Sequence, residues 1–458
     1  MDPQADRELL KRGPKRSAHV ETAPGPGEGG RRVVKRFHGP DLLDRFRDRL
    51  RARNEYGLLG RCKALGLPVP RALELRRQDG SWEVVTEYVE NAPTLDDWLR
   101  GSRPGPSWQK LARDLGRLVA QLMGIGLAHG DLHPGNFLVQ ERTGEAPRLW
   151  LIDLTKSRLR GRLGADRMVQ DLVQLTAGLR ELVSDRMRRR FLVEFQRQLP
   201  IAQQASLPSR AELGRRIEDR ARVFRRRDIE RRTRRWLRNS SSVEPYDGER
   251  GHGFVSRAAS PELVPAILGA RARSSWQGEG RVDVDGHGAW VIDGRSWSTQ
   301  RESWKRQVRL FTHGLPCLTP LCISRHPGGW MALDLGPDLV PVSLGTFDPQ
   351  DSAVRQRIIE SFGRLVGALH DRQLEVQGLR FESLWANAEG ELHFGLTPGL
   401  ADRNEEELLR ADGPHTSAIQ SWSGPWSESD HQVFLNAYTS ALSHSDAERA
   451  RVLGGGEP

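Results

Sequence analysis

The stretch "HGDLHPGNFLV", residues 129–139, combines turn-forming and polar residues and then runs directly into an apolar strand. Asp131 and Asn136 lie five positions apart in it. An aspartate on a loop can accept a hydrogen bond from a substrate hydroxyl and hold it in line with a phosphoryl group. An asparagine at the start of the next strand can offer an oxygen to a cation. The pattern favours a phosphoryl-transfer loop over a turn chosen for backbone chemistry alone.

A second carboxylate stands at the end of the next apolar run. Asp153 closes "RLWLID", and a turn-like segment separates this run from "NFLVQ" at 136–140. If the two runs pair as a hairpin, Asp153 approaches Asn136 and Asp131. Because Mg²⁺ prefers oxygen ligands, we expect Asn136 and Asp153 to form a magnesium site beside Asp131.

Residue periodicity predicts an α+β protein in two lobes. The alternating, β-branched runs 31–37 and 82–89 predict strands, and residues 42–65 predict a long helix that Gly66 ends. A second helix, near 108–126, leads into the opening loop. The apolar stripe expected on the first helix consists of Leu43, Phe46, Leu50, Leu58 and Cys62.

Together these motifs resemble a known family. "HGDLHPGN" followed by "LIDL" is similar to the catalytic loop and metal-binding strand end of the protein-kinase-like superfamily, in the form found in aminoglycoside and choline phosphotransferases. "VVKRF", "ARNEYGLLGRCKALGLPVPRAL" and "VTEYV" resemble the lipopolysaccharide core kinases, which phosphorylate heptose or Kdo sugars. The resemblance implies a two-lobed kinase-like domain over residues 1–237, with an N-lobe at about 8–92 and a C-lobe at about 93–237.

The resemblance also implies a role for each site residue. Lys35 matches the strand lysine that contacts the ATP phosphates, and Glu55 matches the helix glutamate that pairs with it. Asp131 matches the catalytic aspartate, Asn136 the second metal ligand and Asp153 the principal one. The cofactors expected are therefore ATP and Mg²⁺.

Three further residues are expected to support the loop. His129 is expected to brace it, and His133 to act as a loop or substrate-side contact. Asp171 resembles the helix aspartate that supports the catalytic loop, with a helix-surface acid as the alternative. The Gly-x-Gly-x-x-Gly phosphate loop is not evident before Lys35, so backbone, Lys or Arg donors near the basic hairpin "LLKRGPKRSAHV" would have to cover the phosphates.

The second half of the chain resembles the first. "ESFGRLVGALHDRQ" aligns with "RDLGRLVAQLMGIG", and a Gly-Leu-Pro turn recurs at matching places. We therefore expect residues 238–260 to be a linker or irregular connection, and 261–458 to be a degenerate kinase-like domain in tandem with the first. The alternative is an unrelated α+β domain. The alignment places Gly378 at Asp131, Ser383 at Asn136 and Gly395 at Asp153.

Charge and cysteine content bear on the partners. The net charge is +10, and residues 210–238 carry 13 arginines against five acids, which is either a solvated helix face or a patch for phosphates. The partner expected is an anionic sugar or glycolipid, with nucleic acid disfavoured because aromatic residues are scarce there. The three cysteines form no CxxC pair, and no apolar leader opens the sequence, so a cytoplasmic location is expected, with or without peripheral membrane contact.

The expected activity is ATP-dependent transfer of the γ-phosphoryl group to a sugar hydroxyl, most specifically of lipopolysaccharide core. A small-molecule kinase of the aminoglycoside or choline type, a Ser/Thr protein kinase and a non-catalytic kinase-like scaffold are the alternatives. The set of five site residues separates a kinase from a scaffold, since a scaffold has no chemical need to keep it.

Overall fold

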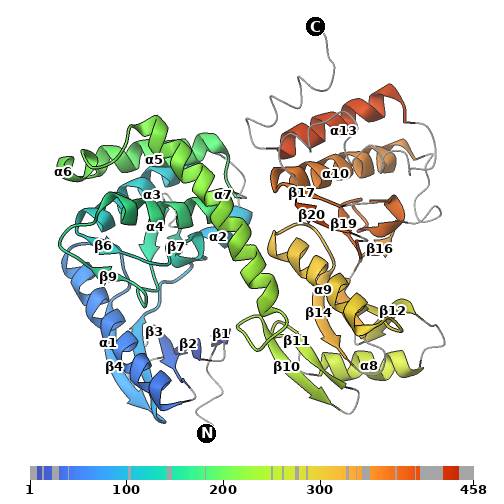
Figure 1. Cartoon of the computed structure of the whole chain (residues 1–458), viewed down its shortest axis with the longest axis horizontal. Helices are drawn as coiled ribbons and strands as arrows, with labels where there is room; N and C mark the ends of the chain where they lie inside the picture. Colours follow the sequence, from blue (N-terminus) through green and yellow to red (C-terminus); the bar gives the residue numbers. More distant parts are fainter. Residues whose placement is uncertain are drawn as a thin grey trace. The chain divides into compact units, whose positions relative to one another are not determined.

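The structure is a computed structural model, and its elements follow in chain order (Figure 1). It describes residues 8–12, 15–22, 30–39, 41–101, 105–141, 147–180, 182–248, 251–259, 262–273, 278–284, 287–325, 330–336, 338–342, 351–376, 379–397, 399–402 and 426–442. The chain divides into two compact units, Met1–Asp228 and Ile229–Pro458. In the described residues, no helix is both long enough and apolar enough to cross a membrane.

The first unit begins with a five-stranded antiparallel sheet in the order β1-β2-β3-β5-β4. Helix α1 lies between β3 and β4 in the chain and packs on β3, β4 and β5. The elements of this lobe are β1 (Glu8–Arg12), β2 (Arg16–Thr22), β3 (Arg31–Phe37), α1 (Leu42–Ala64), β4 (Ala72–Gln78) and β5 (Ser81–Glu87). The strands expected at 31–37 and 82–89 and the helix at 42–65 are therefore confirmed, and α1 is continuous.

The rest of the first unit is mainly helical. Its elements are α2 (Leu95–Gly101), α3 (Pro106–Gly124), β6 (Leu127–Ala128), η1 (Pro134–Asn136), β7 (Phe137–Gln140), β8 (Arg148–Leu151), β9 (Arg158–Leu159), α4 (Ala165–Leu179), α5 (Asp185–Gln198), α6 (Ile201–Gln204) and most of α7 (Arg210–Arg235), which continues past the unit boundary after Asp228. Strands β7 and β8 pair antiparallel with Phe137 opposite Leu151, as the hairpin expectation requires. The expected α+β class is confirmed.

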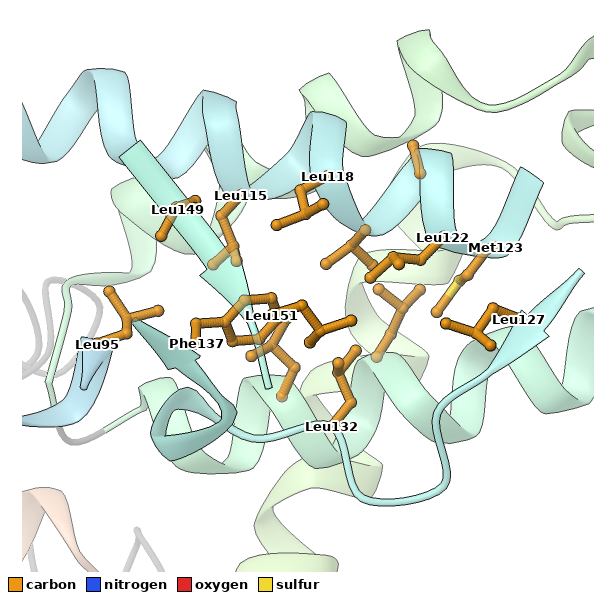
Figure 2. Close-up of a cluster of buried hydrophobic side chains, with 14 of the residues drawn as sticks. Leu95, Leu115, Leu118, Leu122, Met123, Leu127, Leu132, Phe137, Leu149 and Leu151 are labelled. Atoms are coloured by element: carbon orange, nitrogen blue, oxygen red, sulfur yellow. The ribbon is translucent and has the colours of Figure 1, made fainter. Parts of the chain in front are cut away.

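One apolar core holds the opening loop in place. Leu132 comes from the loop, and Phe137 and Leu151 come from β7 and β8; all three are buried among leucines of α3 (Figure 2). Gly116 allows α3 to approach α5 closely, since a Cβ there would lie 2.7 Å from the Phe191 carbonyl oxygen. The polar ends of the loop are thus carried on a well-packed base.

One predicted stripe is wrong in its first half. Leu58 and Cys62 of α1 are buried, but Leu43, Phe46 and Leu50 are exposed. The buried side of this part of the helix instead carries Asp44 and Asp48. The reason is pairing: Lys15 Nζ lies 2.6 Å from Asp44 Oδ2, and the Gly39 amide donates to Asp48 Oδ2 at 2.8 Å. These polar contacts face the lobe and turn the apolar residues outward.

The second unit contains a six-stranded antiparallel sheet in the order β10-β11-β14-β15-β13-β12. Its elements are β10 (Val243–Gly248), β11 (Gly251–Ser256), α8 (Leu263–Arg273), β12 (Glu279–Val284), β13 (His287–Ile292), α9 (Trp297–Thr312), β14 (Thr319–Ser324), β15 (Trp330–Asp334), β16 (Val340–Pro341), α10 (Ser352–Asp371), β17 (Leu374–Glu375), η2 (Phe381–Ser383), β18 (Leu384–Ala386), β19 (Leu392–Phe394), β20 (Ala401–Asp402) and α13 (Glu428–Ala441).

The expected linker at 238–260 is wrong for most of its length. Strands β10 and β11 lie inside it, pair with each other and join the sheet of the second unit through β14. Val243 is fully buried there. The Ser, Gly and charged residues that suggested a linker are compatible with an edge hairpin, whose outer face meets solvent. The boundary between the compact units falls earlier, after Asp228.

Candidate functional site

A partly buried charged network joins the sheet to the hairpin in the first unit. Lys35 on β3 places its Nζ atom 2.9 Å from Glu55 Oε1 on α1 and 2.6 Å from Asp153 Oδ1 after β8. The Thr155 hydroxyl lies 2.7 Å from the same Nζ atom and donates to Glu55 Oε2 or Asp153 Oδ1, each 2.7 Å away. Residues 118 positions apart thus meet in one cluster.

The network fixes the charge of its members. Burial alone would lower the pKa of Lys35, but the carboxylates of Glu55 and Asp153 outweigh burial and raise that pKa above its ordinary value. Burial would raise the pKa of Asp153, whereas Lys35, the Thr155 hydroxyl and Arg16 hold it well below its usual range. At neutral pH the lysine is therefore cationic and the aspartate anionic.

Asp153 has an unusual backbone. Its φ angle is +56°, in the left-handed region that non-glycine residues seldom adopt. Directly before it, the Ile152 amide donates to the Asn136 carbonyl oxygen at 2.9 Å, which ties the end of β8 to the start of β7. The left-handed turn therefore begins next to Asn136. Strain of this kind persists where the surrounding structure fixes it, and it gathers at functional sites.

The loop holds Asp131 from two sides. The Asn136 side-chain amide donates to the Asp131 carbonyl oxygen at 2.8 Å, so its own Oδ1 atom stays available as a ligand oxygen. Lys156 Nζ lies 2.7 Å from Asp131 Oδ2, and both side chains are partly exposed. The carboxylate of Asp131 is thus accessible and lies beside a cation.

Asp171 of α4 contacts the same loop from below. Its buried carboxylate accepts hydrogen bonds from the backbone amides of His129 at 2.8 Å and Gly130 at 3.2 Å. The interpretation of Asp171 as a helix-surface acid is thereby excluded, because the side chain is only 1% exposed. Burial raises its pKa despite the nearby Arg167 and the two amides. These two hydrogen bonds fix the position of the loop relative to α4.

The two histidines differ in environment. His129 is buried, and burial lowers its pKa to about 4 even though Asp153 and Asp131 lie near it, so the ring is neutral at pH 7. His133 is half-buried at the start of η1, with its ring over Gly135. His129 therefore lies in the interior of the loop and His133 on its more accessible side, and the bracing and substrate-side roles expected of them stay predictions.

Sequence reasoning missed four residues that the fold brings to the site. Thr155, Lys156 and Ser157 follow Asp153 directly; Ser157 is fully buried, and its hydroxyl donates to the His129 carbonyl oxygen at 3.1 Å. Arg16 on β2 helps to lower the pKa of Asp153, and its guanidinium carbon lies 5.5 Å from the centre of the Phe37 ring. The signal available was position: polar residues follow Asp153 directly, and a basic turn precedes Lys35.

The donor set fits a magnesium ion that is completed by a nucleotide. In the described part of the chain, no three His, Cys, Asp or Glu side chains gather as a metal site. Mg²⁺ is commonly held by one or two protein oxygens together with substrate phosphates and water, so such a cage is not required. Lys35 and Thr155 both use Asp153 Oδ1, and neither engages its Oδ2 atom.

Comparison with known proteins agrees with this geometry. Residues 39–195 match the lipopolysaccharide kinase (Kdo/WaaP) family. This match confirms the resemblance for about a third of the chain, and it includes every site residue except Lys35 and Arg16. The kinase-like interpretation of the first unit therefore has support from sequence and from geometry.

Individual relatives point the same way. Over 124 residues the chain is 34% identical to 3-deoxy-D-manno-octulosonic acid kinase of Haemophilus influenzae, covering 25% of this chain and 49% of that protein. Over 110 residues it is 29% identical to the KEOPS complex subunit Bud32 of Pyrococcus abyssi, covering 24% and 48%. The chain spans about half the length of the curated relatives it matches.

A solved structure, of WaaP in complex with acyl carrier protein, is 21% identical, with a TM-score of 0.37 over 47% of this chain and 88% of that one. So low a score carries no weight for function.

Proposed function

We propose that the first unit is an ATP-dependent kinase that transfers the γ-phosphoryl group to a hydroxyl of an anionic sugar of the lipopolysaccharide core, heptose or Kdo. The observation that carries the proposal is the Lys35, Glu55, Asp153 and Thr155 network beside Asp131. A buried ion pair is costly to maintain, and replacing one with apolar residues is often neutral or stabilising. A scaffold without turnover would have no use for this arrangement.

The chain's own residues account for the transfer. Lys35, held by Glu55, binds nucleotide phosphate oxygens. The Asp131 carboxylate accepts the proton of the acceptor hydroxyl as the new oxygen–phosphorus bond forms, and the bond from the γ-phosphorus to the bridging oxygen breaks to release ADP. Lys156 orients Asp131 before the acceptor arrives and offers a cation next to the transferred group.

Asn136 and Asp153 would hold Mg²⁺. When bound, the ion neutralises phosphate charge and aligns the triphosphate. Arg16 supplies the remaining cation on the nucleotide side, in place of a glycine-rich loop. It stands two positions along β2 from Ala18, the residue opposite Lys35, so it lies on the same face of the sheet as the lysine.

The acceptor side favours an anionic substrate. Lys156, Arg158, Arg160 and Arg162 alternate along the segment after Asp153, all are exposed, and no acid interrupts them. Strand β9, which contains Arg158, pairs with β6 directly before the catalytic loop. A cationic aminoglycoside or choline would be repelled here, whereas a phosphorylated or carboxylated sugar would be attracted.

A transfer assay tests the proposal. The full chain is incubated with Mg-ATP and with Kdo-containing, heptose-containing, aminoglycoside or protein acceptors, and phosphorylated product is measured. We expect product with the Kdo-containing or heptose-containing acceptors only, and loss of at least about a hundredfold in rate for Asp153→Asn and Asp131→Asn. Asp79→Asn, an exposed acid at a β-turn, is the matched control and should retain full rate. Equal turnover in Asp153→Asn would contradict the proposed chemistry.

We further propose that the second unit is a degenerate copy of the same fold. Each unit has a strand pair, a helix, a second strand pair, a long helix, a 3-10 turn and a short hairpin in the same order. Gly66 and Gly314 both have positive φ at the end of the helix between the strand pairs. Gly363 of α10 abuts the α13 backbone, as Gly116 of α3 abuts α5.

Strand register supports specific counterparts. Strands β13, β14 and β15 pair with one another as β3, β4 and β5 do, and in both units the register shifts at one point between the last two strands. When these shifts are superimposed, Ile292 occupies the position of Lys35. Ser303 lies as far before Gly314 as Glu55 lies before Gly66, so Ser303 is the counterpart of Glu55. Gly395 donates to Ser383 as Ile152 donates to Asn136, so the counterpart of Asp153 is Leu396 and the expected Gly395 is off by one position. The Asp131 counterpart, Gly378, lies outside the described residues.

These replacements remove the charge from the second site. Ile292 is fully buried and Ser303 is 2% exposed, so no ion pair can form between them. We expect calorimetric titration with Mg-ATP to give one binding site per chain. A second site that survives Lys35→Met would contradict the degenerate assignment and leave the proposed function of the first unit intact.

A further inference from the structure

The outward face of the first half of α1 carries a row of large apolar side chains. Leu43, Phe46 and Leu50 are 70%, 59% and 53% exposed. They lie three and four positions apart, so they stand above one another on one helical face. Scattered exposed leucines are ordinary in soluble proteins, but a contiguous row of this kind marks an interaction surface.

Arginines surround this row. Arg45, Arg47, Arg49 and Arg53 of the same helix are exposed. Arg49 and Arg53 lie over the Trp82 ring of β5 at 6.0 and 5.7 Å, which fixes two cations along one flank. Lys15 is exposed at the start of the helix.

The buried acids of this half-helix balance only part of its positive charge, with Asp44 Oδ1 lying 4.0 Å from Arg47 Nη1. Asp44 and Asp48 point inward, where the contacts to Lys15 and Gly39 hold them, and Arg51 lies 3.1 Å from Asp48. The exposed acid of this segment, Asp41, stands at the helix start and accepts from the Asp44 amide. The outer face therefore combines apolar bulk with a net positive border.

We propose that this face, defined by Leu43, Phe46, Leu50 and the arginines at 45, 47, 49 and 53, docks on an anionic lipid bilayer. Leucine and phenylalanine on one side and arginine along the border is the composition of helices that lie in the membrane interface. The apolar side chains enter the boundary between headgroups and acyl chains, and each nearby arginine gains from the negative surface. A protein partner would instead need an acidic groove with an apolar floor.

Docking also has a geometric consequence. The same helix carries Glu55 little more than one turn beyond Leu50, so a membrane contact at its first half holds the Lys35 site close to the lipid surface. The proposal goes beyond the proposed kinase activity and does not depend on it, because vesicle binding is measured without turnover.

Vesicle co-sedimentation of the full chain tests the surface. We expect binding to phosphatidylcholine vesicles that contain phosphatidylglycerol, weak binding to pure phosphatidylcholine vesicles, and a decrease as salt is raised. The triple variant Leu43→Ser, Phe46→Ser, Leu50→Ser should lose more than about tenfold in affinity, since it removes the three apolar side chains that would leave water on docking. Ile201→Ser in α6 removes an apolar residue that is 84% exposed and should bind as the unaltered chain does.

Three outcomes would overturn the proposal. These are equal binding of the triple variant and the unaltered chain, equal binding to neutral and anionic vesicles, and a concentration-dependent dimer that the triple variant abolishes in sedimentation velocity. The last result would assign the face to a second copy of this chain. Circular dichroism and the thermal shift with Mg-ATP check that the triple variant keeps its fold, because none of its positions belongs to the nucleotide site.

Discussion

Replacing Lys35 tests whether the charged network is a coupled unit. Lys35→Met would leave the carboxylates of Glu55 and Asp153 facing each other without their cation, and the Glu55 side chain is only 5% exposed. Breaking a buried ion pair by removing one partner costs about 3–5 kcal/mol, mainly because the remaining charge stays buried. We expect the first unit to lose stability in that range. Glu55→Gln should cost about 1–2 kcal/mol, since Lys35 keeps Asp153 and the amide can still meet Thr155.

The double variant separates charge pairing from simple loss of contacts. With Gln at position 55, Lys35→Met no longer leaves a buried carboxylate there without a cation. The Lys35→Met substitution should therefore lower the stability by about 2 kcal/mol less than it does in the unaltered chain. That coupling energy is the quantity to measure. Additive costs within about 0.5 kcal/mol would refute the argument.

Hydrogen exchange provides the assay and an internal control. Peptides from β3 and α1 report the opening of the first unit, and peptides from β14 and β15 report the second unit in the same sample. A loss of about 3 kcal/mol corresponds to a roughly 150-fold faster exchange of the first set through global opening. The second set should remain unchanged. Equal acceleration in both sets would show that the variant perturbs the chain as a whole.

Three further results are expected. Lys156→Met should lower kcat by about a hundredfold or more with little change in the KM for ATP, and Lys156→Arg should recover part of the lost kcat. Arg158→Met should affect mainly the KM for the acceptor. A Lys156→Met enzyme with unaltered kcat would exclude the cation from the transfer step. The folded-state pKa of His129 is depressed to about 4, so as pH falls below about 6.5 the unfolded chain binds a proton at this residue before the folded chain does. The first unit should therefore lose up to about 1.4 kcal/mol of stability per pH unit between 6.5 and 4. Urea titrations should show a shallower loss for His129→Asn. Gly116→Ala should destabilise the first unit by about 1–3 kcal/mol, because the new methyl group would meet the Phe191 carbonyl oxygen, whereas Gly57→Ala in α1, with nothing within 4 Å, should be neutral or stabilising in the same thermal melt.

Asp153 is a second residue that makes the first unit less stable at acidic pH. The folded-state pKa of Asp153 is depressed, so its contribution is present above the unfolded value near 4 and is lost as pH falls toward the folded value. Lys35 acts at the other end: its raised pKa contributes stability below about pH 10, and this is lost as pH rises through the folded value. Between about pH 6.5 and 10 none of these three groups changes its charge on unfolding, so we expect them to leave the stability of the first unit independent of pH there.

The sequence alone predicted which residues meet in the first unit and the elements that carry them. Asp131, Asn136 and Asp153 were recognisable because their spacing in one loop and hairpin is local, and hairpin pairing requires only neighbouring strands. Lys35 and Glu55 were predicted from the resemblance to a kinase-like family, which places a lysine on a strand ahead of a glutamate on the following helix. For the loop and the hairpin the structure matches this expectation, because over short separations along the chain residue type and period determine the backbone.

Only the tertiary structure decided which faces turn inward and which cations meet the site. Leu43, Phe46 and Leu50 read as core by period but lie outside, because Lys15 and the Gly39 amide pair with the aspartates on the other side of α1. Lys156 meets Asp131 although no spacing rule joins them, and residues 243–256 read as linker but complete a sheet. Side-chain burial and charge pairing depend on long-range neighbours, which a local pattern does not contain.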